Sequence, residues 1–307
     1  MQGYLATRWL GRAGMEVTAL SLGCAGIGAR EGVTDSSAVE TVRRALAAGI
    51  RYLDTSPLYG ESERRVGIAL EGVPRQDYLL STKTGTHPER RHDYSWDGTM
   101  WSVENSLSLL GCGYFDLLLV HDPRDEADMQ TVFGACGALA ALERLKEERV
   151  VRAIGLGQRR HDWHERAIRS GRVDAILTYN DYHPLRTTAL TGGLLQLARD
   201  HGVGVINGSP LAHGLLAGPG AAALMPPSNT DVVSARRLFA WCEAHGVSPV
   251  AIALQLSLRQ PLIGCTLTGA KSVAELDQNL GAVAEPIPER LWAELEAAGF
   301  REDAATA

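Results

Sequence analysis

The stretch "YLDTSPLYGESE", residues 52–63, joins the end of an apolar run to a polar turn. The run ends on a carboxylate, Asp54, and Tyr59 follows five residues later, directly before Gly60. Turn-forming residues alone could account for such a strand end. Whether this is a plain turn or a functional loop therefore depends on how the neighbouring strands end.

Seven further apolar runs follow the same pattern and alternate with longer segments of helical periodicity. Together with 51–54, the expected strands are 19–23, 78–83, 115–121, 151–157, 174–179, 202–207 and 262–267. Several are apolar almost throughout, as strands buried on both faces are. Eight strand–helix units predict an α/β fold, a single (β/α)8 TIM barrel, with a doubly wound open sheet as the alternative. Because barrels often use this length as one domain, we expect one domain over residues 1–307.

The segments between the strands carry helix signals. Residues 35–49 begin at Asp35 as an N-cap and end at Gly49. Residues 130–149 and 231–246 have similar helical patterns. Residues 7–18 precede the first barrel strand and predict a β-hairpin that caps the barrel floor.

Composition excludes several classes of partner. The net charge of −6 gives no basic field for nucleic acid or an anionic membrane. No apolar run approaches the roughly 20 residues that a membrane helix needs, and the N-terminus lacks the apolar core of a signal peptide. The five cysteines form no CxxC pair, which favours reduced thiols and a cytoplasmic location. The sequence leaves the oligomeric state open.

Reactive side chains gather where the expected strands end. Three consecutive strands end at Asp54, Lys83 and His121, and Tyr59 lies in the loop after the first of them. The active site of a barrel lies at the C-terminal ends of its strands. We therefore expect an acid, an amine, an imidazole and a phenol to converge on one face.

These motifs resemble the aldo-keto reductase family over nearly the whole chain. The matching segments are "YLDTSPLYGESERRVGIAL" (52–70), "LLSTKTG" (79–85), "FDLLLVHDP" (115–123), "IGLG" (154–157), "SPLAHGLLAG" (209–218) and "LTGAKSVAELDQN" (267–279). The resemblance implies that Asp54, Tyr59, Lys83 and His121 form the family's catalytic tetrad. "VHDP" and "YSWDG" (94–98) look most like the sugar 1-dehydrogenase branch, which acts on L-galactose, L-fucose and D-threo-aldoses. It implies NAD(P)-dependent hydride transfer to or from an aldose or a related small aldehyde.

The four residue types suit carbonyl chemistry independently of the family. A free tyrosine has a pKa near ~10, and a nearby ammonium favours the phenolate and lowers that pKa. Lys83 would supply this charge and Asp54 would orient Lys83. Tyr59 would then act as general acid in reduction or general base in oxidation. His121 would donate a hydrogen bond to the substrate oxygen.

The cofactor segments lack a Rossmann signature. No GxGxxG occurs, and "GCAGIG" (23–28) has the wrong spacing, but the resembling family binds nicotinamide cofactors without that motif. "GCTLTGAKS" (264–272) is a Gly-rich turn that leads into a helix N-terminus, a ready anion site. The cofactor-binding residues that the resemblance implies are Gln158, Tyr179, Asn180, Ser209, Leu211, Gly269, Lys271, Ser272, Glu275 and Asn279.

Two departures from the family affect the cofactor. Gly208 replaces a tyrosine that often stacks on the nicotinamide, so we expect Tyr179 or Gln158 to hold this ring. Glu275 stands where NADP-using relatives often have an arginine, and a carboxylate there would repel the 2′-phosphate. NAD is therefore favoured over NADP, although Lys271 stays a phosphate partner. Ser272 and Glu275 also have the spacing of a capping box.

The substrate side and the rival functions rest on weaker patterns. Tyr94 and Trp96 follow the third strand and would present aromatic faces to a sugar, and His213 would contact substrate or pyrophosphate. His161 and His164 lack a third ligand nearby, so no metal site is expected.

Loops 86–98, 122–130 and 212–230 would select the substrate. Two other functions stay open. One is a regulatory barrel that binds cofactor with little turnover. The other is a lyase or isomerase that uses Lys83 as a Schiff-base amine, which requires an unpaired lysine.

Overall fold

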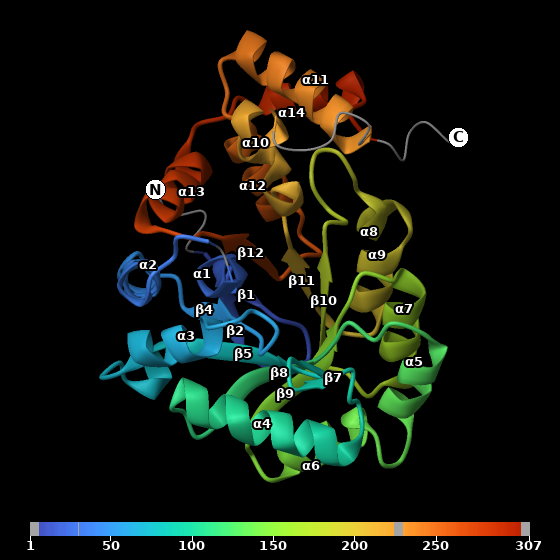
Figure 1. The fold of residues 1–307 in the computed structure, drawn as a ribbon. Helices are drawn as coiled ribbons and strands as arrows, with labels where there is room; N and C mark the ends of the chain where they lie inside the picture. The colour runs from blue at the N-terminus through green and yellow to red at the C-terminus, as the bar shows by residue number, and fades with distance from the viewer. Residues whose placement is uncertain (1–5, 30, 224–229, 302–307) are drawn as a thin grey trace.

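The computed structural model describes residues 6–29, 31–223 and 230–301 and forms a closed parallel barrel surrounded by helices (Figure 1). The barrel strands, in spatial order, are β3 (Leu20–Gly23), β4 (Tyr52–Asp54), β5 (Leu79–Thr84), β8 (Phe115–His121), β9 (Val151–Gly157), β10 (Ala175–Tyr179), β11 (Gly204–Gly208) and β12 (Cys265–Gly269). β12 pairs with β3 and closes the ring. The predicted (β/α)8 barrel is confirmed, and the open sheet is wrong.

The helices occupy the connections between the strands, as the βα repeat requires. They are α1 (Ala25–Ala29), α2 (Asp35–Ala47), α3 (Ser62–Leu70), α4 (Trp96–Leu110), α5 (Glu126–Phe133), α6 (Ala138–Glu147), α7 (His161–Ser170), α8 (Thr188–Thr191), α9 (Leu194–Asp200), α10 (Pro219–Ala223), α11 (Thr230–His245), α12 (Pro249–Arg259), α13 (Val273–Ala284) and α14 (Glu289–Ala298), with 3-10 turns η1 (Arg75–Asp77) and η2 (Ala212–Ala217). A short hairpin, β6 (Thr86–His87) and β7 (Arg90–Arg91), follows β5. None of the helices described is long and apolar enough to cross a membrane.

Strand alternation decides which side chains point into the barrel. In β8, Leu117 and Leu119 belong to the core inside the barrel, whereas Leu118 and Val120 pack in the core that faces the helices. Successive strand residues point to opposite faces. His121, two residues after Leu119, therefore points inward at the C-terminal end.

The same parity places the other two strand-end groups. Tyr52 and Leu79 lie with the inner core, so Asp54, two residues after Tyr52, and Lys83, four residues after Leu79, also point inward. Three functional side chains thus enter the barrel mouth from adjacent strands, because each keeps the register of an apolar residue below it.

The N-terminal hairpin closes the opposite end, as predicted. β1 (Thr7–Trp9) pairs with β2 (Glu16–Thr18), and Leu10 between them is fully buried with the inner core. Gly11 has φ of 48° and bridges to Val203, and a Cβ there would stand 2.3 Å from the nitrogen of Gly204. Glycine is therefore the residue that allows the hairpin to reach the barrel floor.

Several element boundaries differ from the sequence prediction. Asp35 is not the N-cap of α2: Thr34 accepts from the Ser37 amide at 3.2 Å, while Asp35 pairs with Arg64. Residues 130–149 form parts of two helices rather than one. They separate at Gly137, where a Cβ would stand 1.7 Å from the carbonyl oxygen of Thr131.

Two element boundaries later in the chain also differ from the sequence prediction. The last barrel strand runs over Cys265–Gly269 rather than 262–267, because residues 261–262 form a turn and 264 a bend before the strand begins. The segment 212–230, expected as a loop, contains η2 and α10, and its residues 224–229 lie outside the described part of the chain.

Candidate active site

Lys83 and Asp54 form a buried ion pair at the centre of the mouth. Lys83 Nζ lies 2.6 Å from Asp54 Oδ2 and donates to the Thr55 carbonyl at 2.7 Å. Both side chains are almost fully buried. Burial acts to lower the pKa of Lys83, but the charges of Asp54 and Tyr59 outweigh it and hold that pKa above its usual value. Lys83 is therefore an ammonium with its position fixed.

A chain of hydroxyls fixes the second oxygen of Asp54. Ser81 Oγ donates to Asp54 Oδ1 at 2.7 Å, and the Tyr52 hydroxyl donates to Ser81 at 2.8 Å. Each carboxylate oxygen thus has a defined donor, which a buried charge requires. Asp54 is held by neighbours below it in the barrel and holds Lys83 above.

Tyr59 reaches this ion pair because its loop packs tightly against α1. A Cβ on Gly28 would stand 1.7 Å from the Tyr59 carbonyl oxygen, so glycine is required at that approach. Gly60 has φ of 58°, which turns the chain after Tyr59. Lys83 Nζ lies 4.8 Å from the centroid of the Tyr59 ring.

Burial controls the protonation of Tyr59. The residue is half-buried, but its phenol group is enclosed in the mouth. Burial raises the pKa of Tyr59, and the lowering by Lys83 only partly offsets this rise. The expected net decrease is therefore wrong for the free protein. Tyr59 carries its proton at neutral pH.

His121 is a neutral imidazole. Burial, with a smaller effect from the Lys83 charge, lowers its pKa well below 6.5. Its Nδ1 lies 2.7 Å from Thr86 Oγ1 and 3.3 Å from Ser56 Oγ, and both hydroxyls can donate to it. A donor on Nδ1 leaves the ring hydrogen on Nε2. His121 and Tyr59 meet edge to face, with ring centroids 5.9 Å apart.

A cavity of about 620 Å³ connects these groups to the start of α13. Asp54, Tyr59 and His121 line one end. Seven of the expected cofactor residues line the rest: Tyr179, Ser209, Leu211, Gly269, Lys271, Glu275 and Asn279. A Cβ on Gly269 would meet nothing within 4 Å. The cavity is therefore open beside a helix N-terminus, whose first N–H groups have no intrahelical partner and favour anions. The residues present fit a dinucleotide.

Three expected cofactor residues make other contacts. Gln158 donates to the Pro123 carbonyl at 3.1 Å and lines a second cavity. Asn180 lines neither cavity and faces His183 Nε2 at 3.1 Å. Ser272 is the N-cap of α13, where its hydroxyl accepts from the Glu275 amide at 3.3 Å.

Glu275 contacts the residue before the helix instead of forming the expected capping box. Its carboxylate accepts from the Lys271 amide at 3.0 Å and lies 3.5 Å from Lys271 Nζ. The capping box would place this contact at the Ser272 amide. Lys271, the expected phosphate partner, is thus already paired with Glu275.

The aromatic residues expected at the substrate are not in the cavities. Tyr94 is buried behind β8, where its hydroxyl donates to the carbonyls of His121 at 2.8 Å and Asp122 at 2.9 Å. Its prediction as a sugar-stacking residue is wrong, because the ring supports the strand end from behind. Trp96 begins α4 and lines neither cavity. His213 does line the larger cavity, 6.1 Å from the Tyr179 ring.

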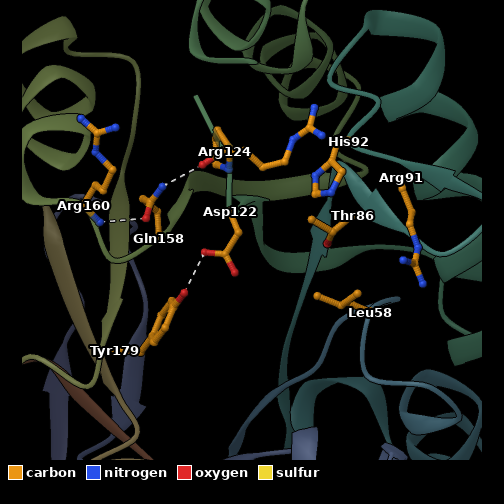
Figure 2. Close-up of a pocket in the computed structure, with 10 residues that line it drawn as sticks. Leu58, Thr86, Arg91, His92, Asp122, Arg124, Gln158, Arg160 and Tyr179 are labelled. Carbon is orange, nitrogen blue, oxygen red and sulfur yellow. Dashed lines mark hydrogen bonds between the residues drawn. The ribbon is translucent and has the colours of Figure 1, made fainter. Parts of the chain in front are cut away.

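Asp122 is a site residue that the sequence reasoning missed. It accepts from the Tyr179 hydroxyl at 3.2 Å (Figure 2). It also lines both cavities and lies 3.4 Å from His121 Nε2. Burial raises its pKa. The signal was present in "VHDP", where only the histidine was taken as functional. Thr86, on the hairpin after β5, was also missed as a functional residue.

The fold and this site define a class: a nicotinamide-dependent oxidoreductase built on a (β/α)8 barrel. The Aldo/keto reductase family model matches residues 19–299, and the chain belongs to that family. It is 36% identical to L-galactose dehydrogenase of Arabidopsis thaliana over 286 residues, which cover 91% of this chain and 88% of that protein.

Two further comparisons agree with the family. The chain is 33% identical to D-threo-aldose 1-dehydrogenase of a Pseudomonas species, with 92% of this chain and 94% of that protein covered. The holo form of an aldo-keto reductase from Bacillus halodurans has a TM-score of 0.77 at 25% identity, with 96% of each chain covered. The protein is an NAD(P)-dependent oxidoreductase.

Proposed function

We propose that this enzyme interconverts an aldose, or a related small aldehyde, with its oxidised or reduced counterpart, using Asp54, Tyr59, Lys83 and His121 as the catalytic groups. The observation that carries the proposal is the fixed Lys83–Asp54 pair beside a protonated phenol and a neutral imidazole in one cavity. The relatives named as L-galactose and D-threo-aldose dehydrogenases support an aldose substrate.

The residues account for the proton in both directions. The bound nicotinamide would donate or accept the hydride at the carbonyl carbon. In reduction the π electrons of the carbonyl move to its oxygen, and the Tyr59 proton is transferred there. The Lys83 ammonium stabilises the phenolate that is left. His121 donates its Nε2 hydrogen to the same oxygen and stabilises the negative charge as it develops. Oxidation reverses each transfer.

The larger cavity supplies the cofactor contacts. We infer that the start of α13 and Gly269 hold the phosphate end, because Gly269 leaves open space beside a helix N-terminus, which favours anions. Asn279 donates to Thr268 Oγ1 at 2.9 Å and ties this helix to β12, next to the space for the adenosine. Tyr179 lies close to the reacting groups, since it contacts Asp122 beside His121, and we infer that it packs against the nicotinamide.

NAD is favoured over NADP in this proposal. None of the described residues that line the larger cavity is an arginine, and its one lysine, Lys271, is paired with Glu275. A 2′-phosphate would therefore meet a carboxylate instead of a free cation. We also propose a cytoplasmic location, in keeping with the five cysteines that are present as free thiols.

The rival functions fit the mouth less well. A Schiff-base mechanism needs an uncharged amine, whereas Asp54 keeps Lys83 charged and the Thr55 carbonyl occupies one of its hydrogens. A regulatory barrel would have no need of a proton donor and a hydrogen-bond donor, Tyr59 and His121, beside a fixed Lys83–Asp54 pair.

The experiment is an activity screen. The purified protein is assayed with NAD+ and NADP+ on a panel of aldoses, and with the reduced cofactors on simple aldehydes. We expect turnover with at least one aldose, with NAD preferred. Tight cofactor binding without turnover on any aldose or aldehyde would favour the regulatory barrel. Borohydride trapping of substrate on Lys83 would favour the lyase.

A further inference from the structure

A second cavity, of about 500 Å³, adjoins the reaction site on the side away from α13. It shares Leu58, Asp122 and Tyr179 with the larger cavity. The remaining lining residues come from the loops after β5, β8 and β9, and are Thr86, Arg91, His92, Pro123, Arg124, Gln158 and Arg160. Since the larger cavity fits the cofactor, the smaller one is the space left for the body of the substrate.

This smaller cavity is cationic. Three of its ten lining residues are arginines, although the chain as a whole has a net charge of −6. Asp122 is the one carboxylate in the lining. Arg124 is paired with Asp128 at 2.9 Å and Arg160 with Asp162 at 2.5 Å. Arg91 forms no ion pair with any residue in the described ranges, so its charge is available to a ligand.

The hairpin after β5 directs Arg91 toward the reaction site. Arg91 pairs with Thr86 across the two short strands, and directly opposed residues of a hairpin share one face. Thr86 Oγ1 lies 2.7 Å from His121 Nδ1, so this face is the one that contacts the imidazole. Figure 2 shows Arg91, His92 and Leu58 on one side of the cavity, with Gln158 and Tyr179 across from them.

The neighbouring arginine differs. The guanidinium of Arg90 lies 4.4 Å from the centre of the Trp101 ring, and Arg90 is not part of the cavity lining. Two adjacent arginines on one short strand thus have different surroundings: one stacks on an aromatic ring and the other lines the cavity. This provides a matched control.

We propose that the preferred substrate carries an anionic group, a carboxylate or a phosphate, at the end remote from the reacting carbon, and that Arg91 binds this group. The proposal rests on the proposed function, because it places the reacting carbonyl at Tyr59 and His121. Guanidinium matches carboxylate and phosphate with two parallel hydrogen bonds. Arg124 and Arg160 at the same rim are paired with Asp128 and Asp162, so Arg91 is the cation that would bind the anion. The substrate class is thus an aldose acid or an aldose phosphate.

The test compares matched neutral and anionic substrates. kcat/KM is measured for para-nitrobenzaldehyde and para-carboxybenzaldehyde, which differ in charge without sugar stereochemistry. An aldose, its uronate and its terminal phosphate ester from the glucose and galactose series then distinguish carboxylate from phosphate. We expect the wild type to prefer the anionic member about tenfold or more, with a KM that rises with salt.

Variants locate the effect. Arg91→Ala is expected to lower kcat/KM for the anionic substrates about 10- to 100-fold, as for a lost hydrogen bond to a charge, and to leave the neutral ones within about twofold. Arg91→Lys retains part of the preference, and Arg90→Ala retains all of it. Equal kcat/KM for both members in the wild type, or an equal loss for both in Arg91→Ala, overturns the proposal.

Binding measurements distinguish a failure of this proposal from a failure of the proposed function. If neither substrate turns over, the proposed function fails, and calorimetry with para-(hydroxymethyl)benzoate at saturating cofactor still decides the anion site. Binding that is at least about tenfold weaker in Arg91→Ala than in wild type supports the site. Equal affinity in the two proteins overturns it.

Discussion

Among single residues, burial sets the protonation of the mouth. It raises the pKa of Tyr59 and lowers that of His121, while the Asp54 charge holds the pKa of Lys83 high. The free protein therefore presents a neutral phenol, a neutral imidazole and an ammonium. These groups provide a proton donor, an uncharged hydrogen-bond donor for the carbonyl oxygen, and a cation that stabilises the phenolate.

Replacing Tyr59 by Phe removes the proton donor and keeps the ring. We expect kcat to fall about 10²- to 10⁴-fold, the usual contribution of a general acid or base. Cofactor affinity, measured by fluorescence titration, should stay nearly unchanged, because the phosphate end lies at α13. Turnover is measured under single-turnover conditions, so that product release does not mask the chemical step.

The control for this variant is Tyr78→Phe. Tyr78 is also buried, but it directly precedes β5, at the end of that strand opposite the mouth. It should keep wild-type kcat. Near-normal turnover by Tyr59→Phe, with Tyr78→Phe as reference, would show that another group donates the proton.

The individual site residues differ in how well the sequence predicts their placement. Asp54, Lys83 and His121 were placed correctly in the mouth, because each ends an apolar run and strand parity fixes its direction. Tyr94 was misplaced, because nothing local distinguishes a ring that faces a cavity from one that packs behind a strand. Arg91 was missed, since its role depends on a hairpin that brings it opposite Thr86.

Among the elements, the start of α13 combines two roles. Ser272 accepts from the helix amide of Glu275, while the Glu275 carboxylate accepts from the Lys271 amide just before the helix and neutralises Lys271 beside the expected cofactor site. The two roles can be tested separately, because replacing Glu275 by Gln keeps a hydrogen-bond acceptor and removes the negative charge.

Glu275→Arg is expected to shift the ratio of kcat/KM values toward NADP and to lower the melting temperature. An exposed charge contact is worth about 1 kcal/mol or less, which limits the wild-type preference for NAD from Glu275 to about fivefold. The lost hydrogen bond from the Lys271 amide costs about 0.5–1.5 kcal/mol.

Glu275→Gln serves as the matched control. Its amide oxygen can still accept from the Lys271 amide, so the melting temperature should stay close to wild type while the cofactor ratio changes. If wild type prefers NADP, Lys271 outweighs Glu275. If Glu275→Arg melts earlier with an unchanged cofactor ratio, Glu275 stabilises the start of the helix and has no part in cofactor choice.

Element boundaries show where sequence patterns stop being sufficient. The eight strands were predicted because buried parallel strands are nearly continuous apolar runs. The N-cap of α2 was misassigned by one residue, since Thr34 and Asp35 are both good caps and tertiary ion pairs with Arg64 and Arg65 take up Asp35. The break between α5 and α6 depends on the close approach of Gly137 to Thr131, which helical periodicity does not reveal.

At the scale of the whole molecule, three buried histidines are held neutral. Burial lowers the pKa of His164 to about 4 and that of His183 to about 3, and lowers that of His121 well below 6.5. The unfolded chain binds protons at these residues near pH ~6.5, and the folded protein does not. Each therefore contributes stability that is complete above this pH and is lost as the pH falls toward the folded pKa.

We expect the free energy of unfolding to fall between about pH 7 and pH 5, by about 2 kcal/mol for each of His164 and His183. Urea unfolding at several pH values measures this. The raised pKa values of Glu63 and Asp122 act in the opposite direction, so a variant must isolate one histidine.

His164→Gln provides this isolation, because an amide can still donate to the Gln158 carbonyl that His164 Nε2 faces at 2.8 Å. This variant should lose less stability than wild type on the same acid titration. His201→Gln, at an exposed position, should follow the wild-type curve. Parallel curves for His164→Gln and wild type would contradict the assignment.

The hairpin under the barrel has a consequence for how the chain is made. Arg8 donates to the carbonyl of Ile263 at 2.7 Å, a contact between residues 255 positions apart. A ribosome that adds about 5–20 residues per second separates their synthesis by roughly 13–50 seconds. During that interval the barrel that Leu10 covers is incomplete, and the edge of β3 has no partner until β12 has been synthesised. A nascent chain that stalls before Cys265 therefore exposes both the apolar side chain of Leu10 and the unpaired edge of β3. Such features recruit chaperones or start aggregation.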